Sequence, residues 1–197
     1  KDFQVTTKRG FYRESNPNGV PGNRNGRESQ VTYSVVSCNY DYPEIDGTWY
    51  ITYTVFDNGV IRVNNEFIAK KPKVAMIPRV GLRMQVPVNY KQLTYYGRGP
   101  WENYCDRKTG AFIGEYDFDV NKMYEPYLRP QENNHRTDVR WFTLKDKSGA
   151  GIMFIADNTF EINASSYPME TFDSGDDIYN EQPVSETTCH RHINDPK

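Results

Sequence analysis

Apolar and polar residues alternate along most of this chain, with the two-residue period that places successive side chains on opposite faces of a β-strand. Asp57-Asn58-Gly59, which separates two alternating segments, is typical of a hairpin turn. The pattern therefore predicts an all-β fold, a large antiparallel β-sandwich with long loops. The expected strands are 2–9, 30–40, 49–56, 60–69, 79–87, 92–96, 137–145, 151–156 and 160–165.

The domain organisation follows from length and from segments without periodicity. The 197 residues suffice for one large all-β domain, and we expect a single β-sandwich domain over 1–197. Residues 13–27 are rich in Gly, Pro, Asn and Arg, which predicts a mobile loop. Residues 168–197 are mostly polar and predict a weakly defined tail.

Charge and composition exclude several classes of partner. The net charge is −2 and basic residues are scattered, so we expect no nucleic-acid partner. No apolar run reaches membrane-spanning length, and we expect no membrane partner. Cys38, Cys105 and Cys189 are odd in number and far apart, which argues against a disulfide framework and leaves one pair open. The compartment, cytoplasmic or periplasmic, stays open.

Residues 96–141 hold the densest mixture of aromatic, acidic, amide and basic side chains. Such side chains suit a polar, ring-shaped ligand, and they equally suit a network of ion pairs that fastens long loops. Composition favours the second interpretation, because structural ion-pair networks are common. The candidate carbohydrate-binding or structural cluster is Trp101, Glu102, Tyr104, Arg107, Glu132, Asn133, His135 and Arg136.

Within this cluster, two groups could do acid–base chemistry. A glycosidase needs two carboxylates that face each other across a sugar, and Glu102 and Glu132 are candidates by neighbourhood. The structural alternative pairs each of them with a nearby Arg107, Arg136 or Arg140. His135 is either a general acid or base or a simple hydrogen-bonding group.

Two further observations concern metals and exposed rings. His190 and His192 share one face of a strand, a spacing compatible with a metal, but no further ligand is evident and we predict no metal site. Trp141 is expected in the core. Trp101 follows a Gly-Pro corner among polar neighbours and is expected to be partly exposed.

Several motifs, in one order, resemble the C-terminal small-chain domain of family 2 β-galactosidases. Between Pro78 and Trp141 these are RxGL, YGxGPxENYxDR and PYxxPQENxxRxDVRW. The later segments FEINASSY and CHRH resemble the strands that follow in that domain. The resemblance covers 29–167 well and the two ends loosely.

The resemblance implies a supersandwich, related to galactose mutarotase-like architecture, that packs on a separate catalytic barrel. In that family the barrel supplies both catalytic glutamates, so we expect no catalytic residue in this chain. A late Trp behind a Gly-Asp-Asp-like turn helps to close the family's galactose pocket. Gly175-Asp176-Asp177 has no Trp behind it, so that role is not transferred, and we expect the fold to be truncated at its C-terminal end.

We therefore predict a non-catalytic domain of a retaining β-galactosidase, whose parent enzyme hydrolyses terminal β-D-galactosides. The expected partners are a galactoside or other carbohydrate and the other domains of the same polypeptide. No cofactor is expected in this chain, and a divalent-metal requirement of the parent enzyme stays open. The alternatives are a stand-alone carbohydrate-binding module and a mutarotase-like enzyme with His135 as base.

Overall fold

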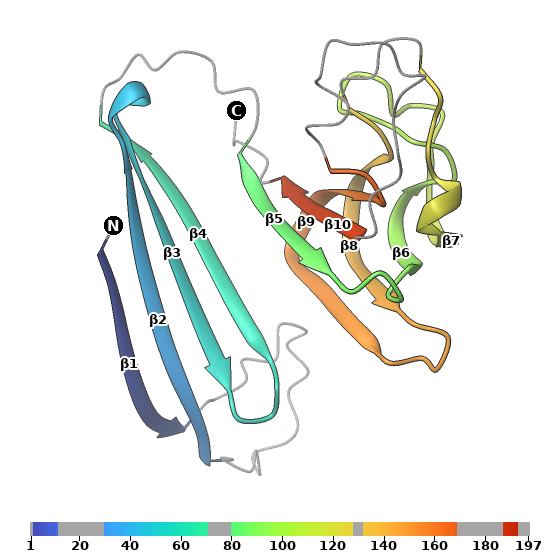
Figure 1. Ribbon diagram of the computed structural model, residues 1–197. Coiled ribbons are helices and arrows are strands. Elements are labelled where there is room, and N and C mark those ends of the chain that lie inside the picture. The colour runs from blue at the N-terminus through green and yellow to red at the C-terminus, as the bar shows by residue number, and fades with distance from the viewer. Residues whose placement is uncertain (1, 12–29, 71–79, 128–131, 169–186, 193–197) are drawn as a thin grey trace, which may run out of the picture. The chain divides into compact units, whose positions relative to one another are not determined.

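The computed structural model describes residues 2–11, 30–70, 80–127, 132–168 and 187–192 (Figure 1). The chain divides into two compact units, Lys1–Ile77 and Pro78–Lys197. Both units consist of antiparallel strands, which confirms the predicted fold class, an all-β antiparallel sandwich. The supersandwich arrangement and the single domain stay predictions. The loop predicted at 13–27 and most of the tail at 168–197 lie outside the described residues. In the described ranges, no helix is long and apolar enough to cross a membrane.

The first unit is an antiparallel sheet of four strands in which each strand pairs with the next one in sequence. The strands are β1 (Asp2–Phe11), β2 (Gln30–Tyr42), β3 (Gly47–Phe56) and β4 (Ile61–Ala69), with the 3-10 helix η1 (Pro43–Ile45) after β2. The predicted turn joins β3 to β4. Gly59 has φ 86°, a conformation that glycine adopts without steric cost. Asn58 Oδ1 accepts a hydrogen bond of 3.0 Å from the Val60 amide, which closes the turn.

The second unit is a six-stranded antiparallel sheet of order β5-β10-β9-β8-β6-β7 (Figure 1). Its elements are β5 (Gly81–Val86), β6 (Gln92–Gly99), β7 (Phe112–Asp119), the 3-10 helix η2 (Val120–Lys122), β8 (His135–Lys145), β9 (Gly151–Ser165) and β10 (Thr187–His192). The strand β10 lies between β5 and β9. This position confirms the prediction that the CHRH segment forms a strand.

One face of the second sheet carries the hydrophobic core. Leu93 and Tyr95 on β6 are in register with Leu144 and Phe142 on β8, so alternate residues of both strands enter the core together. The Phe142 ring stacks on Phe154 with 4.4 Å between centroids. Burying each large side chain contributes about 1.5–3 kcal/mol. The buried cluster is Val86, Leu93, Tyr95, Val120, Met123, Val139, Phe142, Leu144, Phe160, Ile162 and Ala164.

Three strands differ from the prediction. The strand β7 was not predicted, and β9 is continuous where two separate strands were expected. The strand β6 continues through Gly97 and Gly99, which were expected to end it. Close packing explains both glycines: a Cβ on Gly97 would lie 2.9 Å from the Val139 Cα, and one on Gly99 would overlap the Tyr95 hydroxyl.

The strand β8 is irregular where it leads into the candidate site. Its register with β9 shifts between Arg136 and Val139 and again between Val139 and Trp141. Asp138 in this bulge has φ 52°, a left-handed conformation that Asp tolerates better than most residues. Bulges change the direction of side chains. Val139 stays in the core, whereas Arg140 and Trp141 are half-buried on the opposite, outer face, which corrects the core position expected for Trp141.

Candidate functional site

The loop after β6 and the segment before β8 carry the two halves of the predicted cluster, and the structure brings them into contact. The backbone amide of Asn103 donates a hydrogen bond of 2.9 Å to the His135 carbonyl. Asn103 Oδ1 also accepts bonds from the Thr137 amide at 3.0 Å and the Thr137 hydroxyl at 2.6 Å. Because these bonds join segments 34 residues apart in sequence, they fix the loop on the sheet.

Glu102 is the buried centre of this contact. Its Oε1 accepts hydrogen bonds from Arg107 Nη2 and from the Tyr127 hydroxyl. Its Oε2 accepts a bond of 3.0 Å from the backbone amide of Asn134 and lies 3.5 Å from the Tyr104 hydroxyl. A buried carboxylate needs such partners, since an unpaired charge in a protein interior is very costly. The Glu102–Arg107 ion pair expected as the structural alternative is therefore present.

Aromatic stacking joins the two halves a second time. The Tyr104 ring lies parallel to the His135 imidazole, with 4.8 Å between centroids and 9° between planes. The Arg107 guanidinium lies 4.8 Å from the centroid of the Tyr104 ring. Burial, followed by the charge of Glu102, raises the pKa of the Tyr104 hydroxyl, so this phenol stays neutral at physiological pH.

His135 is buried, and hydrogen bonds engage both of its ring nitrogens. Nδ1 lies 2.7 Å from Asn163 Oδ1, and Nε2 lies 3.1 Å from Glu161 Oε2. A general acid or base must reach the proton that it transfers to or from a substrate. A buried imidazole bonded on both sides and stacked under Tyr104 fits the hydrogen-bonding interpretation better.

The side chain of Asn133 ties the segment that precedes β8 to the backbone of Glu125. Its Nδ2 donates a bond of 2.6 Å to the Glu125 carbonyl, and its Oδ1 accepts one of 2.9 Å from the Glu125 amide. Asn163 Nδ2 donates a bond of 2.6 Å to the Asn133 carbonyl. Glu132 is half-buried, and its predicted pairing with Arg136 stays a prediction.

Arg136 is buried against the core face of the sheet. Its Nε donates a hydrogen bond of 3.0 Å to the Tyr95 hydroxyl, and its Nη1 donates one of 2.9 Å to the His135 carbonyl. Its guanidinium carbon lies 5.6 Å from the Phe118 ring centroid and 6.0 Å from that of Tyr95. The side chain therefore acts as a planar bridge between strands β6, β7 and β8.

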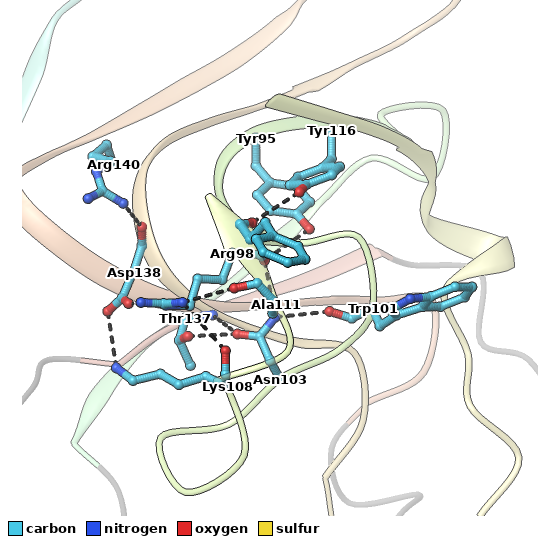
Figure 2. Close-up of polar contacts among 11 residues, drawn as sticks. Tyr95, Arg98, Trp101, Asn103, Lys108, Ala111, Tyr116, Thr137, Asp138 and Arg140 are labelled. Atoms are coloured by element: carbon cyan, nitrogen blue, oxygen red, sulfur yellow. Dashed lines mark hydrogen bonds and ion pairs between the residues drawn. The ribbon is translucent and has the colours of Figure 1, made fainter. Parts of the chain in front are cut away.

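A second network, which the sequence interpretation missed, surrounds the β8 bulge (Figure 2). Asp138 accepts bonds from Arg98 Nε at 2.5 Å and from Lys108 Nζ at 3.3 Å. Arg98 Nη1 also donates a bond of 2.8 Å to the Ala111 carbonyl. The YGxGPxENYxDR and DVRW motifs contain Arg98, Asn103 and Asp138, but only the folded chain shows that these residues meet.

Trp101 is the predicted site residue that projects from these networks. Its carbonyl accepts a bond of 2.9 Å from Asn103 Nδ2, which anchors the backbone at this position. Its side chain is 72% exposed and points away from the Asp138 network (Figure 2). The expected exposure of Trp101 is confirmed, and an exposed indole on an anchored backbone offers a flat face to a ligand.

Asp138 is expected to make stability depend on pH. Partial burial raises the pKa of its carboxyl, but hydrogen bonds and charges from Arg98 and Lys108 outweigh burial and hold the pKa below its ordinary value. The resulting stabilisation is present above the ordinary aspartate pKa, about 3.9, and is lost as pH falls through the lowered pKa of the folded state. Urea denaturation between pH 3 and pH 6 should show a smaller loss on acidification for Asp138→Asn than for wild type. Equal losses in both proteins would contradict the assignment.

The structure gives no sign of a metal centre in the part of the chain that it describes. Among those residues, no three His, Cys, Asp or Glu side chains gather closely enough to hold an ion. Cys38 and Cys105 are free thiols. The side chains of His190 and His192 lie outside the described part of β10, so their predicted role stays untested.

The fold and the loop-fastening networks define an antiparallel all-β protein in which the polar residues of the candidate site bond mainly to one another. Residues 4–193 match the family described as beta galactosidase small chain, and the chain belongs to this family.

Its relatives include beta-galactosidases of Priestia megaterium, 33% identical over 83% of this chain, and of Lactobacillus delbrueckii subsp. bulgaricus, 37% identical over 63%. A beta-galactosidase of Streptococcus thermophilus is 36% identical over 58% of the chain. The matched region spans only 16%, 12% and 11% of these three relatives.

Proposed function

We propose that residues 1–197 form a non-catalytic part of a retaining β-galactosidase, which packs on the rest of the enzyme and helps to shape its sugar pocket. In the whole protein, terminal β-D-galactosides would be hydrolysed by double displacement between two carboxyl groups about 5–5.5 Å apart. One observation supports the non-catalytic role. Glu102 and His135, the groups best suited to acid–base chemistry, are buried and bonded to other protein groups.

The first test measures hydrolysis of an aryl β-galactoside. Purified residues 1–197 should release no phenol above the uncatalysed rate, whereas a longer polypeptide that includes them should. Turnover by residues 1–197 alone would overturn the proposal.

Glu102→Gln in the longer polypeptide separates a structural from a catalytic carboxylate. A structural Glu102 predicts lower stability with kcat per folded molecule within about tenfold of wild type, because a lost general acid or base typically costs 10²–10⁴-fold. A loss of kcat in that larger range, in a protein that stays folded, would make Glu102 catalytic.

The exposure of Trp101 favours a second candidate, a stand-alone carbohydrate-binding module. On this hypothesis, galactose or lactose binds residues 1–197 with a millimolar or lower Kd, which Trp101→Ala abolishes and Trp101→Phe largely retains. Calorimetric titration measures it. Binding that Trp101→Ala leaves unchanged would exclude this ring as the sugar platform.

A further inference from the structure

The outer face of the second sheet carries a row of apolar side chains across three strands. Tyr96 on β6 is in register with Trp141 on β8, which is in register with Ile155 on β9. The Tyr96 and Trp141 rings stack with 6.4 Å between centroids. Ile155 is 69% exposed, and Met153, two residues earlier and thus on the same face, is also exposed. We name Tyr96, Trp141, Met153 and Ile155 the outer strip.

Basic side chains gather around the β8 bulge (Figure 2), next to the outer strip. Arg98 and Lys108 both bond the Asp138 carboxylate, and Arg140 Nη1 donates a bond of 2.5 Å to the Asp138 carbonyl. The Arg140 guanidinium also lies 5.5 Å from the Tyr96 ring centroid, which connects the two features. We name Arg98, Lys108 and Arg140 the basic cluster. Two partly exposed cations thus pair with the Asp138 carboxylate, and a third is bonded to the backbone carbonyl of the same residue.

Other carboxylates on this face lie on the strands that flank β6 and β8. On β9, Asp157 is two residues after Ile155 and therefore on the same face, opposite the part of β8 where the register shifts. Glu115 and Asp117 are on the edge strand β7, on the opposite side of β6 from β8. Asp117 accepts a hydrogen bond of 2.6 Å from the Thr94 hydroxyl. The basic cluster carries three positive charges against the carboxylates of Asp138 and Asp157, so one positive charge remains and an added carboxylate would be attracted there.

We propose that the outer strip and the basic cluster form a docking face for a part of the β-galactosidase polypeptide outside residues 1–197. The docking segment places apolar side chains on the outer strip and a carboxylate against the basic cluster. This inference rests on the proposed function, since it assumes that the chain acts within a longer enzyme. The matched region is 16% of the Priestia megaterium relative, so most of such a protein lies outside it.

Physical chemistry favours covering this face. Contiguous exposed apolar side chains with a polar border mark interaction sites, because burying them contributes about 25 cal/mol per Å². Charge complementarity at the border then fixes the register of the contact more than its strength. The outer strip and the basic cluster supply these two components side by side.

Cysteine labelling of the whole enzyme tests the docking face. Ile155→Cys and Phe112→Cys are made in the full-length polypeptide after its native cysteines are replaced by serine. Phe112 is the matched control, because it is 74% exposed but lies on the opposite face of the sheet. It is in register with Gly99, and a Cβ on Gly99 would point to the core residue Tyr95. We expect a maleimide to label Ile155→Cys at least tenfold more slowly than Phe112→Cys. Equal rates would overturn the docking face.

A charge reversal tests the carboxylate of the docking segment. Adding Lys108→Glu should accelerate labelling of Ile155→Cys severalfold, whereas Lys145→Glu, an exposed lysine at the end of β8, should leave it unchanged. Equal effects of both reversals would contradict the carboxylate contact. Protection that disappears on dilution would assign the face to a second copy of the protein and overturn the proposed occupant.

The same samples separate failure of the inference from failure of the proposed function. An enzyme that hydrolyses an aryl β-galactoside, yet labels at both positions equally, retains the proposed function without the docking face. A full-length polypeptide that never hydrolyses β-galactosides contradicts the proposed function, and the labelling contrast then still decides whether the face is covered.

Discussion

Replacing Glu102 by alanine should lower the free energy of unfolding of residues 1–197 by about 3 kcal/mol, because a buried charged group and its partners are separated. The side chain of Glu102 is only 5% exposed, and the Asn134 amide that it accepts from is buried as well. The change leaves that amide without its acceptor and Arg107 without its counter-ion. Urea denaturation, followed by tryptophan fluorescence, measures the effect.

Two further variants give this prediction its control. Glu115→Ala changes an exposed carboxylate on the edge strand β7 and should alter stability by no more than about 0.5 kcal/mol. Glu102→Gln keeps an acceptor for the Asn134 amide but not the ion pair, so its effect should fall between the two. If Glu102→Ala and Glu115→Ala unfolded at the same urea concentration, the central role of Glu102 would be wrong.

Arg136→Ala is expected to cost about 3–4 kcal/mol, since it removes buried packing as well as hydrogen bonds. The guanidinium lies beside the rings of Tyr95 and Phe118 and bonds the Tyr95 hydroxyl and the His135 carbonyl. Truncation therefore leaves a cavity next to the core and removes the donor to the Tyr95 hydroxyl, while the His135 carbonyl keeps only its bond from the Asn103 backbone amide. The unfolding midpoint of residues 1–197 in urea reports the loss.

The matched variants separate charge from shape at this position. Arg136→Lys keeps the charge and part of the stem but not the planar fork, so it should recover less than half of the loss. Arg83→Ala, at an exposed position on β5, should cost much less than Arg136→Ala. Full recovery by lysine would show that only the charge matters and would refute the bridging geometry.

The strands were the most predictable part of this protein. Alternation and the Asp57-Asn58-Gly59 turn predicted β3, β4 and the hairpin between them, because both signals are local. The glycines of β6 misled the prediction for a non-local reason. Gly97 tolerates the close approach of Val139 from β8, and the residues around Gly97 in the sequence do not predict that contact.

The candidate site was predictable in composition and not in geometry. The eight predicted residues all lie in two short segments, and the Glu102–Arg107 pair could be expected from neighbourhood alone. The stack of Tyr104 on His135 and the contact of Arg98 with Asp138 could not, because sequence gives no distance between residues so far apart. The irregular register of β8 places Asp138 beside Arg98 and turns Arg140 and Trp141 to the outer face.

Sequence by itself therefore determined the all-β class, most of the strands and, through its motifs, the beta galactosidase small chain family. These properties follow from side-chain periodicity, turn chemistry and motif order, each of which depends on residues that are close together in the sequence. The tertiary structure alone decided which polar groups are engaged and which surfaces remain open, as the contrast between buried Glu102 and exposed Trp101 shows. The physical reason is that burial and hydrogen bonding depend on strand register and on contacts between residues that are far apart in the sequence.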